Sequence, residues 1–185
     1  MCVIPISVLV RVATLLALPG SAACDDANPI DYDKPRGLET VELTFSSSNL
    51  VGDNVEDTTP VLSARFLEDI HRELGPVFSG IELKKLVITF DPPVAGLAGW
   101  SDLFQGELHV YFDTDSGDNF LVSTTTAPSG FDALPLPIEV SNDELSASAD
   151  MLSGHFSVRL QATSGMGPQD QFALALTVNM TFDAY

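Results

Sequence analysis

Cysteine is almost missing from this 185-residue chain, which contains only Cys2 and Cys24. Two cysteines near one end cannot form the disulfide framework that holds many small secreted domains together. The chain after them is long enough for one domain, and a 45% content of hydrophobic residues can fill one core. The domain must therefore be stabilised by apolar packing.

Basic residues are also scarce. Eight Lys and Arg stand against 26 Asp and Glu, so the formal net charge is −18 at neutral pH. Such a charge repels the phosphates of nucleic acid and the anionic surface of a membrane. Nucleic acid is therefore excluded as a partner, and the acidic surface is typical of a highly soluble domain.

The residue patterns of common catalytic sites are missing as well. His71, His109 and His155 lack the spacing of metal ligands, and the chain has no Gly-x-Ser-x-Gly motif. Its glycines lie in turns rather than in a phosphate-binding loop that opens a helix. These absences favour a protein that is not an enzyme. The alternative from another class is a carboxylate-based envelope hydrolase, because Asp and Glu are abundant.

The N-terminal end has the layout of a secretory signal. One charge, Arg11, precedes an apolar run over residues 12–18, which ends at Pro19-Gly20. The run is shorter than the roughly twenty residues that a membrane-spanning helix needs. Ser21 and Ala23 are the small residues that a signal peptidase requires before its cleavage site. We therefore predict that residues 1–23 are a signal peptide.

The predicted cleavage site is followed by Cys24, and the sequence Ser-Ala-Ala-Cys over residues 21–24 resembles the lipobox of bacterial lipoproteins. The resemblance implies that Cys24 carries diacylglycerol and that the protein is anchored in a membrane through this lipid. We expect an exported, lipid-anchored protein of the cell envelope on its periplasmic or surface face. The alternative is a soluble secreted or periplasmic domain.

An acidic segment follows Cys24. It contains two prolines and shows no periodicity of apolar residues. Residues 24–37 are therefore predicted to form a flexible tether. The folded domain is expected over residues 38–185.

The chain beyond the tether mostly alternates apolar and polar residues with the two-residue period of half-buried strands. This alternation predicts strands within residues 41–45, 81–90, 108–112, 120–124, 134–140, 145–151, 156–162 and 172–182. About eight such strands favour an all-β fold, an antiparallel β-sandwich with immunoglobulin-like topology.

Three details of the strands can be predicted. The apolar positions change parity near Lys84-Lys85, which indicates a β-bulge. Segments 108–112 and 120–124 form a hairpin in which His109 and Tyr111 face away from the apolar side. Two prolines within 134–140 place that strand at the edge of a sheet.

One helix is predicted after the first strand. Thr59 is a suitable N-cap, Pro60 is tolerated at the first helical position, and Gly75-Pro76 ends the helix. An apolar stripe on this helix is expected to cover the sheets and consists of Leu62, Phe66, Leu67, Ile70 and Leu74.

The best candidate for a metal site is the acidic turn of the predicted hairpin. Asp113, Asp115 and Asp118 could direct carboxylate oxygens at Ca²⁺, and the turn partly resembles an EF-hand loop. Asp, Ser, Gly and Asn are also the ordinary residues of turns. A plain hairpin turn is therefore the alternative interpretation.

Two loops contain aromatic residues that could bind a partner. One loop carries Trp100, which is the only tryptophan, and the other carries Phe131 next to Gly130. Loops at the end of a sandwich often bind ligands. The alternative is that both rings fold back onto the core. The sequence thus predicts a non-enzymatic binding, adhesion or structural module whose partner is an envelope or extracellular protein or a glycan.

Overall fold

The structure is a computed structural model that describes residues 36–46, 50–51, 54–75, 78–91, 97–165 and 173–185. The chain divides into two compact units, residues 1–33 and 34–185, and the described residues belong to the second. The predicted signal peptide and Cys24 lie outside the described residues. Arg36 and Gly37, predicted as the end of the tether, already belong to the first strand.

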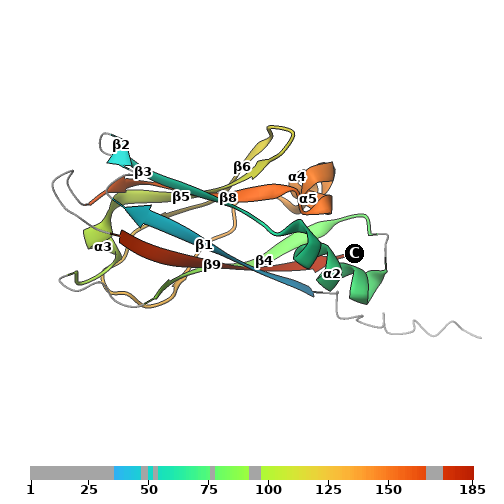
Figure 1. The fold of residues 1–185 in the computed structure, drawn as a ribbon, viewed down its shortest axis with the longest axis horizontal. Coiled ribbons are helices and arrows are strands. Elements are labelled where there is room, and N and C mark those ends of the chain that lie inside the picture. Colours follow the sequence, from blue (N-terminus) through green and yellow to red (C-terminus); the bar gives the residue numbers. More distant parts are fainter. Residues whose placement is uncertain (1–35, 47–49, 52–53, 76–77, 92–96, 166–172) are drawn as a thin grey trace, which may run out of the picture. The chain divides into compact units, whose positions relative to one another are not determined.

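The second unit consists of two antiparallel β-sheets packed against each other, with helices at both ends (Figure 1). The four-stranded sheet has the order β1 (Arg36–Ser46), β9 (Ala173–Ala184), β4 (Ile81–Asp91) and β7 (Leu134–Pro135). The five-stranded sheet has the order β2 (Leu50–Val51), β3 (Asn54–Pro60), β8 (Phe156–Ser164), β5 (Phe104–Thr114) and β6 (Asn119–Thr126). The predicted all-β sandwich is confirmed.

The order of the strands follows a nested pattern. Without the two-residue β2, the first strand pairs with the last, β3 with β8, β4 with β7, and β5 with β6. The chain is therefore one long antiparallel hairpin wound over two sheets, which is the topology of a jelly roll. An immunoglobulin sandwich instead groups its strands as ABED and CFG. The jelly-roll order thus replaces the immunoglobulin-like topology predicted from the sequence.

The inward positions of both sheets form one core. The alternation predicted from the sequence holds in β5 and β8, whose inward hydrophobic residues are all less than 3% exposed. Fully buried aromatic rings hold the centre, with Phe112 and Phe182 6.1 Å apart between ring centres. The predicted bulge is confirmed between Leu83 and Lys85, and it keeps Ile81, Leu83 and Leu86 in the core.

The main helix, α2 (Ser63–Leu74), starts later than predicted. Thr59 and Pro60 belong to β3 because Pro60 continues its pairing with β8, and the Thr59 hydroxyl donates to the carbonyl of Glu42 at 2.7 Å. The helix ends at Gly75 as predicted, with a φ of 81° there. It also follows β3, not the first strand.

Helix α2 covers the core with part of its apolar stripe. Phe66 and Ile70 are fully buried, whereas Leu62 is 68% exposed. The ring centre of Phe66 lies 5.1 Å from that of Phe182 in an edge-to-face contact. A Cβ on Gly37 would lie 3.3 Å from Ile70, so glycine allows β1 to approach the helix this closely.

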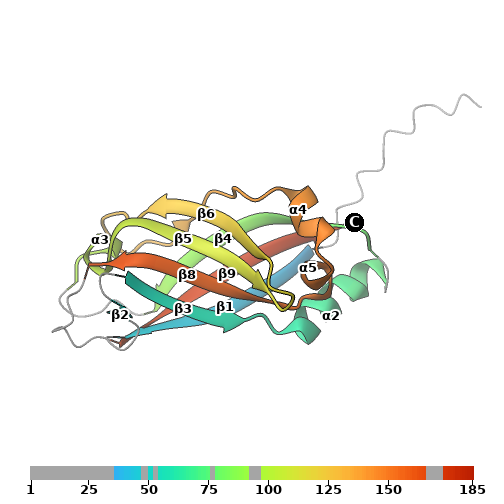
Figure 2. The same cartoon turned by 90° about the horizontal axis from the view of Figure 1, so that it is seen from above.

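Segment 145–151 is helical, and the predicted strand there is wrong. It forms parts of α4 (Asn142–Ala147) and α5 (Ala149–Ser153). Ser141 accepts a hydrogen bond from the backbone of Glu144, and the Glu144 carboxylate accepts one from the backbone of Ser141. This capping box favours a helix start, and it outweighs the alternation of apolar and polar residues in segment 145–151. A further short helix, α3 (Trp100–Leu103), lies at the opposite end of the sandwich (Figures 1 and 2).

Both open edges of the sandwich are bridged. At one edge, the backbone N–H of Thr44 in β1 donates to the carboxylate of Asp57 in β3 at 2.7 Å. At the other, the chain after β7 bonds to β4 through Leu136 and to β6 through Glu139. The predicted edge position of this proline-containing segment is confirmed, although only Leu134–Pro135 pairs as a strand. Bridged edges prevent pairing with another chain.

The part of the chain that the structure describes contains no helix long and apolar enough to cross a bilayer.

Candidate binding face

The three residues predicted to bind calcium do not converge on one point in the structure. The Asp113 carboxylate is bound by Arg159 at 2.6 and 3.1 Å, whereas Asp115 and Asp118 are exposed in the turn after β5. The turn is closed by its own hydrogen bonds, including one of 2.9 Å from the backbone of Asp118 to the Thr114 hydroxyl. Among the described residues, no three His, Cys, Asp or Glu side chains gather as metal ligands. The geometry therefore favours the plain turn.

The acidic turn is also anchored to α5. The backbone N–H of Ser116 donates to the carboxylate of Asp150 at 2.8 Å. A hydrogen bond from the Ser116 hydroxyl, and after it this backbone hydrogen bond, lower the pKa of Asp150. Asp150 thus binds the turn as an anion, which a neutral side chain could not do as strongly.

The two loop aromatics pack inward. Trp100 is fully buried, and its indole N–H donates to the carbonyl of Asp132 at 3.0 Å. The half-buried Phe131 lies 6.4 Å from Trp100, and both rings contact Phe90. The backbone N–H of Trp100 also donates to Gly130, which joins the two loops. This cluster closes one end of the core, as the alternative interpretation of the loops expects.

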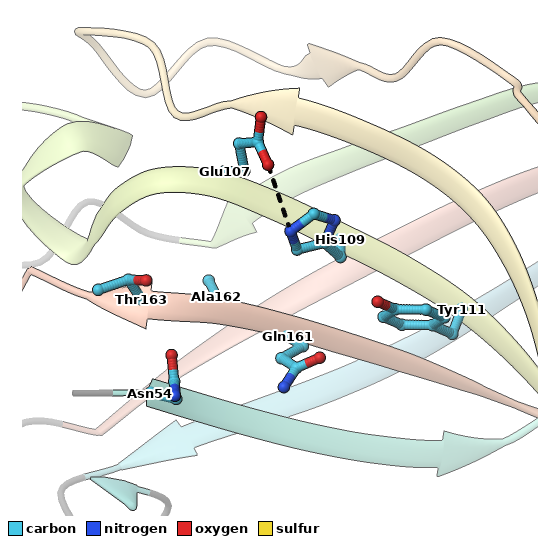
Figure 3. A pocket seen from close by; sticks show the side chains of 7 residues that line it. All are labelled: Asn54, Glu107, His109, Tyr111, Gln161, Ala162 and Thr163. Atoms are coloured by element: carbon cyan, nitrogen blue, oxygen red, sulfur yellow. Dashed lines mark ion pairs between the residues drawn. The ribbon is translucent and has the colours of Figure 1, made fainter. Parts of the chain in front are cut away.

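A hollow of about 330 Å³ lies on the outer face of the five-stranded sheet (Figure 3). Three neighbouring strands, β3, β5 and β8, contribute its lining, which consists of Asn54, Glu107, His109, Tyr111, Gln161, Ala162 and Thr163. Most of these are polar side chains that alternate with the core residues of the same strands. The hollow is the strongest candidate for a binding site in the described residues.

A bulge in β5 accounts for the hollow. Gln105 is paired with Thr163 and Leu108 with Ala162, so β5 advances three residues while β8 advances one. Gly106 takes a φ of 75°, a left-handed value that favours glycine. The extra residues separate the two strands locally and carry Glu107 onto the outer face. The recess is therefore built into the backbone.

Strand register sets the neighbours at the centre of this face. His109 lies opposite Gln161 on β8 and Thr124 on β6, while Tyr111 lies opposite Arg159. Side chains paired in this way have Cβ atoms about 5 Å apart. The phenol of Tyr111 points along the sheet towards the other lining residues (Figure 3).

Arg159 holds one side of the hollow in place. Its guanidinium makes a bidentate ion pair with Asp113, lies 3.4 Å from Glu56, and covers the ring of Tyr111. The hydrogen bonds to Asp113 raise the pKa of Arg159 despite its partial burial. Cation–π and bidentate contacts together fix both side chains before any ligand arrives.

His109 lies between Glu107 at the rim of the hollow and Thr124 on β6. Its Nε2 lies 3.6 Å from a carboxylate oxygen of Glu107, and its Nδ1 lies 3.4 Å from the hydroxyl of Thr124. The Glu107 side chain is 65% exposed, so water screens its charge. The pair offers an acceptor and a ring that can donate or accept hydrogen bonds.

The most perturbed carboxyl of the described residues lies elsewhere. Glu39 is 2% exposed on the inner side of β1, and burial raises its pKa to about 7. Arg65 opposes this rise and Asp69 adds to it. Within the described residues, Oε1 of Glu39 has no hydrogen-bond partner. Glu39 does not line the hollow.

Another hollow lies between α2 and α5. It is mainly apolar and is lined by Leu67, His71, Phe78, Ala149, Leu152 and Ser153. Both helices belong to the end of the sandwich where α4 also lies (Figure 2). Its lining has few polar side chains to orient a ligand, in contrast with the hollow on the sheet.

The sequence predicts that His109 and Tyr111 lie on the outer side of their strand, but it does not predict a binding site there. A signal was present at Gly106, since glycine inside a strand often marks a bulge. The rest of the lining could not be found because β3 and β8 are far from β5 in sequence. No protein-family model matches the chain, and no curated protein matches it. The site therefore rests on its geometry.

Proposed function

We propose that the protein is an exported, lipid-tethered binding module of the cell envelope and that it acts without catalysis. The hollow on the outer face of the five-stranded sheet is its binding site. The observation that carries this proposal is the convergence of polar side chains from three strands around a recess of about 330 Å³. Small-ligand sites are concave and largely preformed, and their polar groups fix the orientation of the ligand.

The rigidity of the face supports a binding role. Its lining residues stand on paired strands, and the Arg159 ion pair with Asp113 fixes Tyr111 at one side. Side chains held on strands keep their geometry better than side chains on loops. A preorganised site loses less conformational entropy when it binds.

The tether explains how such a face would be presented. A lipid on Cys24 would hold the domain at a membrane, and the acidic segment after it would separate the domain from the bilayer. The first strand begins at Arg36, so the segment between Cys24 and Arg36 is long enough to serve as a spacer. The net charge of −18 keeps the domain from adhering to anionic lipid.

The tether is tested by the mass of the N-terminal peptide. The full-length protein is expressed in a bacterium, and membrane and soluble fractions are digested separately. We expect the peptide starting at Cys24 to carry diacylglycerol in the membrane fraction. An unmodified Cys24 in soluble protein would support the alternative of a secreted or periplasmic domain.

The binding face is tested with isolated envelope fragments. Retention of the wild-type protein is compared with that of Gln161→Ala, in the hollow, and of Asn179→Ala. Asn179 is a matched control because it stands on β9 of the other sheet and accepts a hydrogen bond from Thr40 at 3.0 Å. We expect only Gln161→Ala to reduce retention. Equal retention of the two variants would contradict the proposed face, and no retention of the wild type would contradict the binding function.

A carboxylate-based hydrolase is the alternative from another class. It would need a carboxyl with a perturbed pKa in a cavity with a second carboxyl nearby. The raised pKa belongs to Glu39, which is buried under α2 and away from the lining of the hollow. This placement gives the hydrolase no support.

A further inference from the structure

We infer that the hollow takes a neutral, polyhydroxylated ligand, namely a sugar unit of a glycan. This inference rests on the proposed function, because it names the ligand class of the same site. The inference follows from the chemistry of the lining, from the ion pairs that occupy Arg159, and from the size of the hollow.

The lining is suited to hydroxyl groups. Asn54 and Gln161 carry amides, which place a donor and an acceptor side by side. Thr163 and Tyr111 add hydroxyls that donate and accept, and Glu107 adds an acceptor. Adjacent hydroxyls on a sugar ring need this mixture of donors and acceptors in a small area. A ligand with no polar groups would leave these side chains without partners.

An anionic ligand does not fit this hollow. Among the described residues, Arg159 is the strong cation on this face, and its guanidinium is bound by Asp113 and Glu56. A phosphate or carboxylate would meet Glu107 at the rim and the field of a chain with a net charge of −18. Like charges placed together at an interface oppose binding.

The lining of the hollow offers a cationic ligand fewer matching groups than it offers a neutral one. Glu107 is the one carboxylate among the lining residues, and 65% exposure of its side chain weakens its attraction for a cation. His109 already lies 3.6 Å from that carboxylate and would compete for it when protonated. The amide and hydroxyl groups, which make up most of the polar lining, show no preference for a positive charge.

The size and position of the hollow agree with one sugar unit. Its volume of about 330 Å³ is at the lower end of the range for small-ligand sites. It lies on the outer side of the sheet, not between the two sheets, so the rest of a glycan can continue along the surface (Figure 3). The ring of Tyr111 and the imidazole of His109, whose centres are 6.3 Å apart, add apolar surface for the C–H groups of a sugar.

The inference is tested by titration of the full-length protein in a detergent that has no sugar headgroup. NMR spectra follow the addition of neutral hexoses, pentoses, N-acetylhexosamines and their disaccharides. Glucosamine and glucuronate serve as cationic and anionic comparisons. We expect saturable binding of at least one neutral sugar and weaker binding of both charged ones.

Three variants locate the binding. Gln161→Ala and Tyr111→Phe each remove polar atoms from the hollow, and the loss of one hydrogen bond weakens binding by about fivefold. Tyr111→Phe keeps the ring that Arg159 covers, so the fixed arrangement at that side is retained. The control Asn179→Ala is expected to bind as the wild type does.

The outcomes separate this inference from the proposed function. If no neutral sugar saturates the protein while Gln161→Ala still loses retention on envelope fragments, the ligand class is wrong and the binding face stands. If glucosamine binds more tightly than neutral sugars in a Gln161-dependent manner, the hollow is a cation site and the inference is overturned. If a sugar binds the wild type and all three variants equally well, the hollow is neither the binding site nor a sugar site.

Discussion

The guanidinium carbon of Arg159 lies 4.1 Å from the centre of the Tyr111 ring. The two residues stand opposite each other on β8 and β5, in the middle of the outer face. Arg159 is held at the same time by the carboxylate of Asp113, so its planar group bridges an ion pair and an aromatic ring. A residue with all of these contacts positions its neighbours and is not available as a cation for a ligand.

Replacement of this arginine tests its positioning role. Arg159→Lys keeps the charge but loses the bidentate hydrogen bonds and the planar stack on Tyr111. We expect the free energy of unfolding to fall by about 2 kcal/mol, measured by urea denaturation. Arg72→Lys is the control, because Arg72 forms an exposed ion pair with Asp69 within α2. An equal effect of the two variants would contradict a special role for Arg159.

The buried carboxyl of Glu39 makes stability depend on pH. Its pKa is about 7 in the folded protein against 4.5 for the free group, so the folded state binds the proton more tightly. The contribution of Glu39 to the free energy of unfolding is therefore fully present below pH 4.5, and it is lost as the pH rises towards 7. The full loss above the folded pKa is about 3 kcal/mol.

Glu39→Gln removes this titration. We expect the variant to be more stable than the wild type above pH 7 and to show a flatter dependence of unfolding free energy on pH. Urea denaturation across this range measures the slope. The control is Glu42→Gln, an exposed position on the same strand, which should keep the wild-type slope. An unchanged slope in Glu39→Gln would show that another group causes it.

The capping box of α4 predicts the effect of a single hydroxyl. Ser141→Ala removes the acceptor for the backbone N–H of Glu144 and should destabilise the domain by about 1 kcal/mol. The hydrogen bonds from Ser141 also lower the pKa of Glu144, so the variant should shift that pKa back upward. Urea denaturation and NMR titration measure the two effects. Ser129→Ala, in an exposed loop, should change neither.

Calcium should leave the melting temperature unchanged. Asp113 is bound by Arg159, and the turn that carries Asp115 and Asp118 is closed by hydrogen bonds to Thr114 and Asp150. Calorimetry with and without millimolar Ca²⁺ measures the difference, because an ion that binds only the folded state raises the melting temperature. An upward shift that Asp118→Asn abolishes would restore the predicted calcium site.

Much of the fold could be predicted because it depends on local patterns. The alternation of apolar residues located most strands, and the change of parity before Leu86 located the bulge in β4. The end of α2 was visible at Gly75. The start of α2 was misplaced because Thr59 and Pro60 satisfy the rules for a helix start but pair with β8 in the folded chain.

The remaining features depend on contacts that local patterns do not contain. Ser141 and Glu144 could have revealed α4, since a Ser followed three residues later by Glu is the pattern of a capping box. The hollow has no such local pattern. Gln161 and His109 are 52 positions apart in the chain and become neighbours only through the register of β5 and β8. The jelly-roll order was missed for the same reason.

The nested pairing of strands also determines when the domain can fold. β1 pairs along its whole length with β9, so the first and last strands of the sandwich complete each other. Folds with such distant contacts form slowly, because the chain must close long loops before its strands pair. A chain that emerges from its N-terminal end, on a ribosome or through a membrane, cannot complete the four-stranded sheet until residues 173–184 have been released. The four-stranded sheet can therefore be completed only after the C-terminal strand is free.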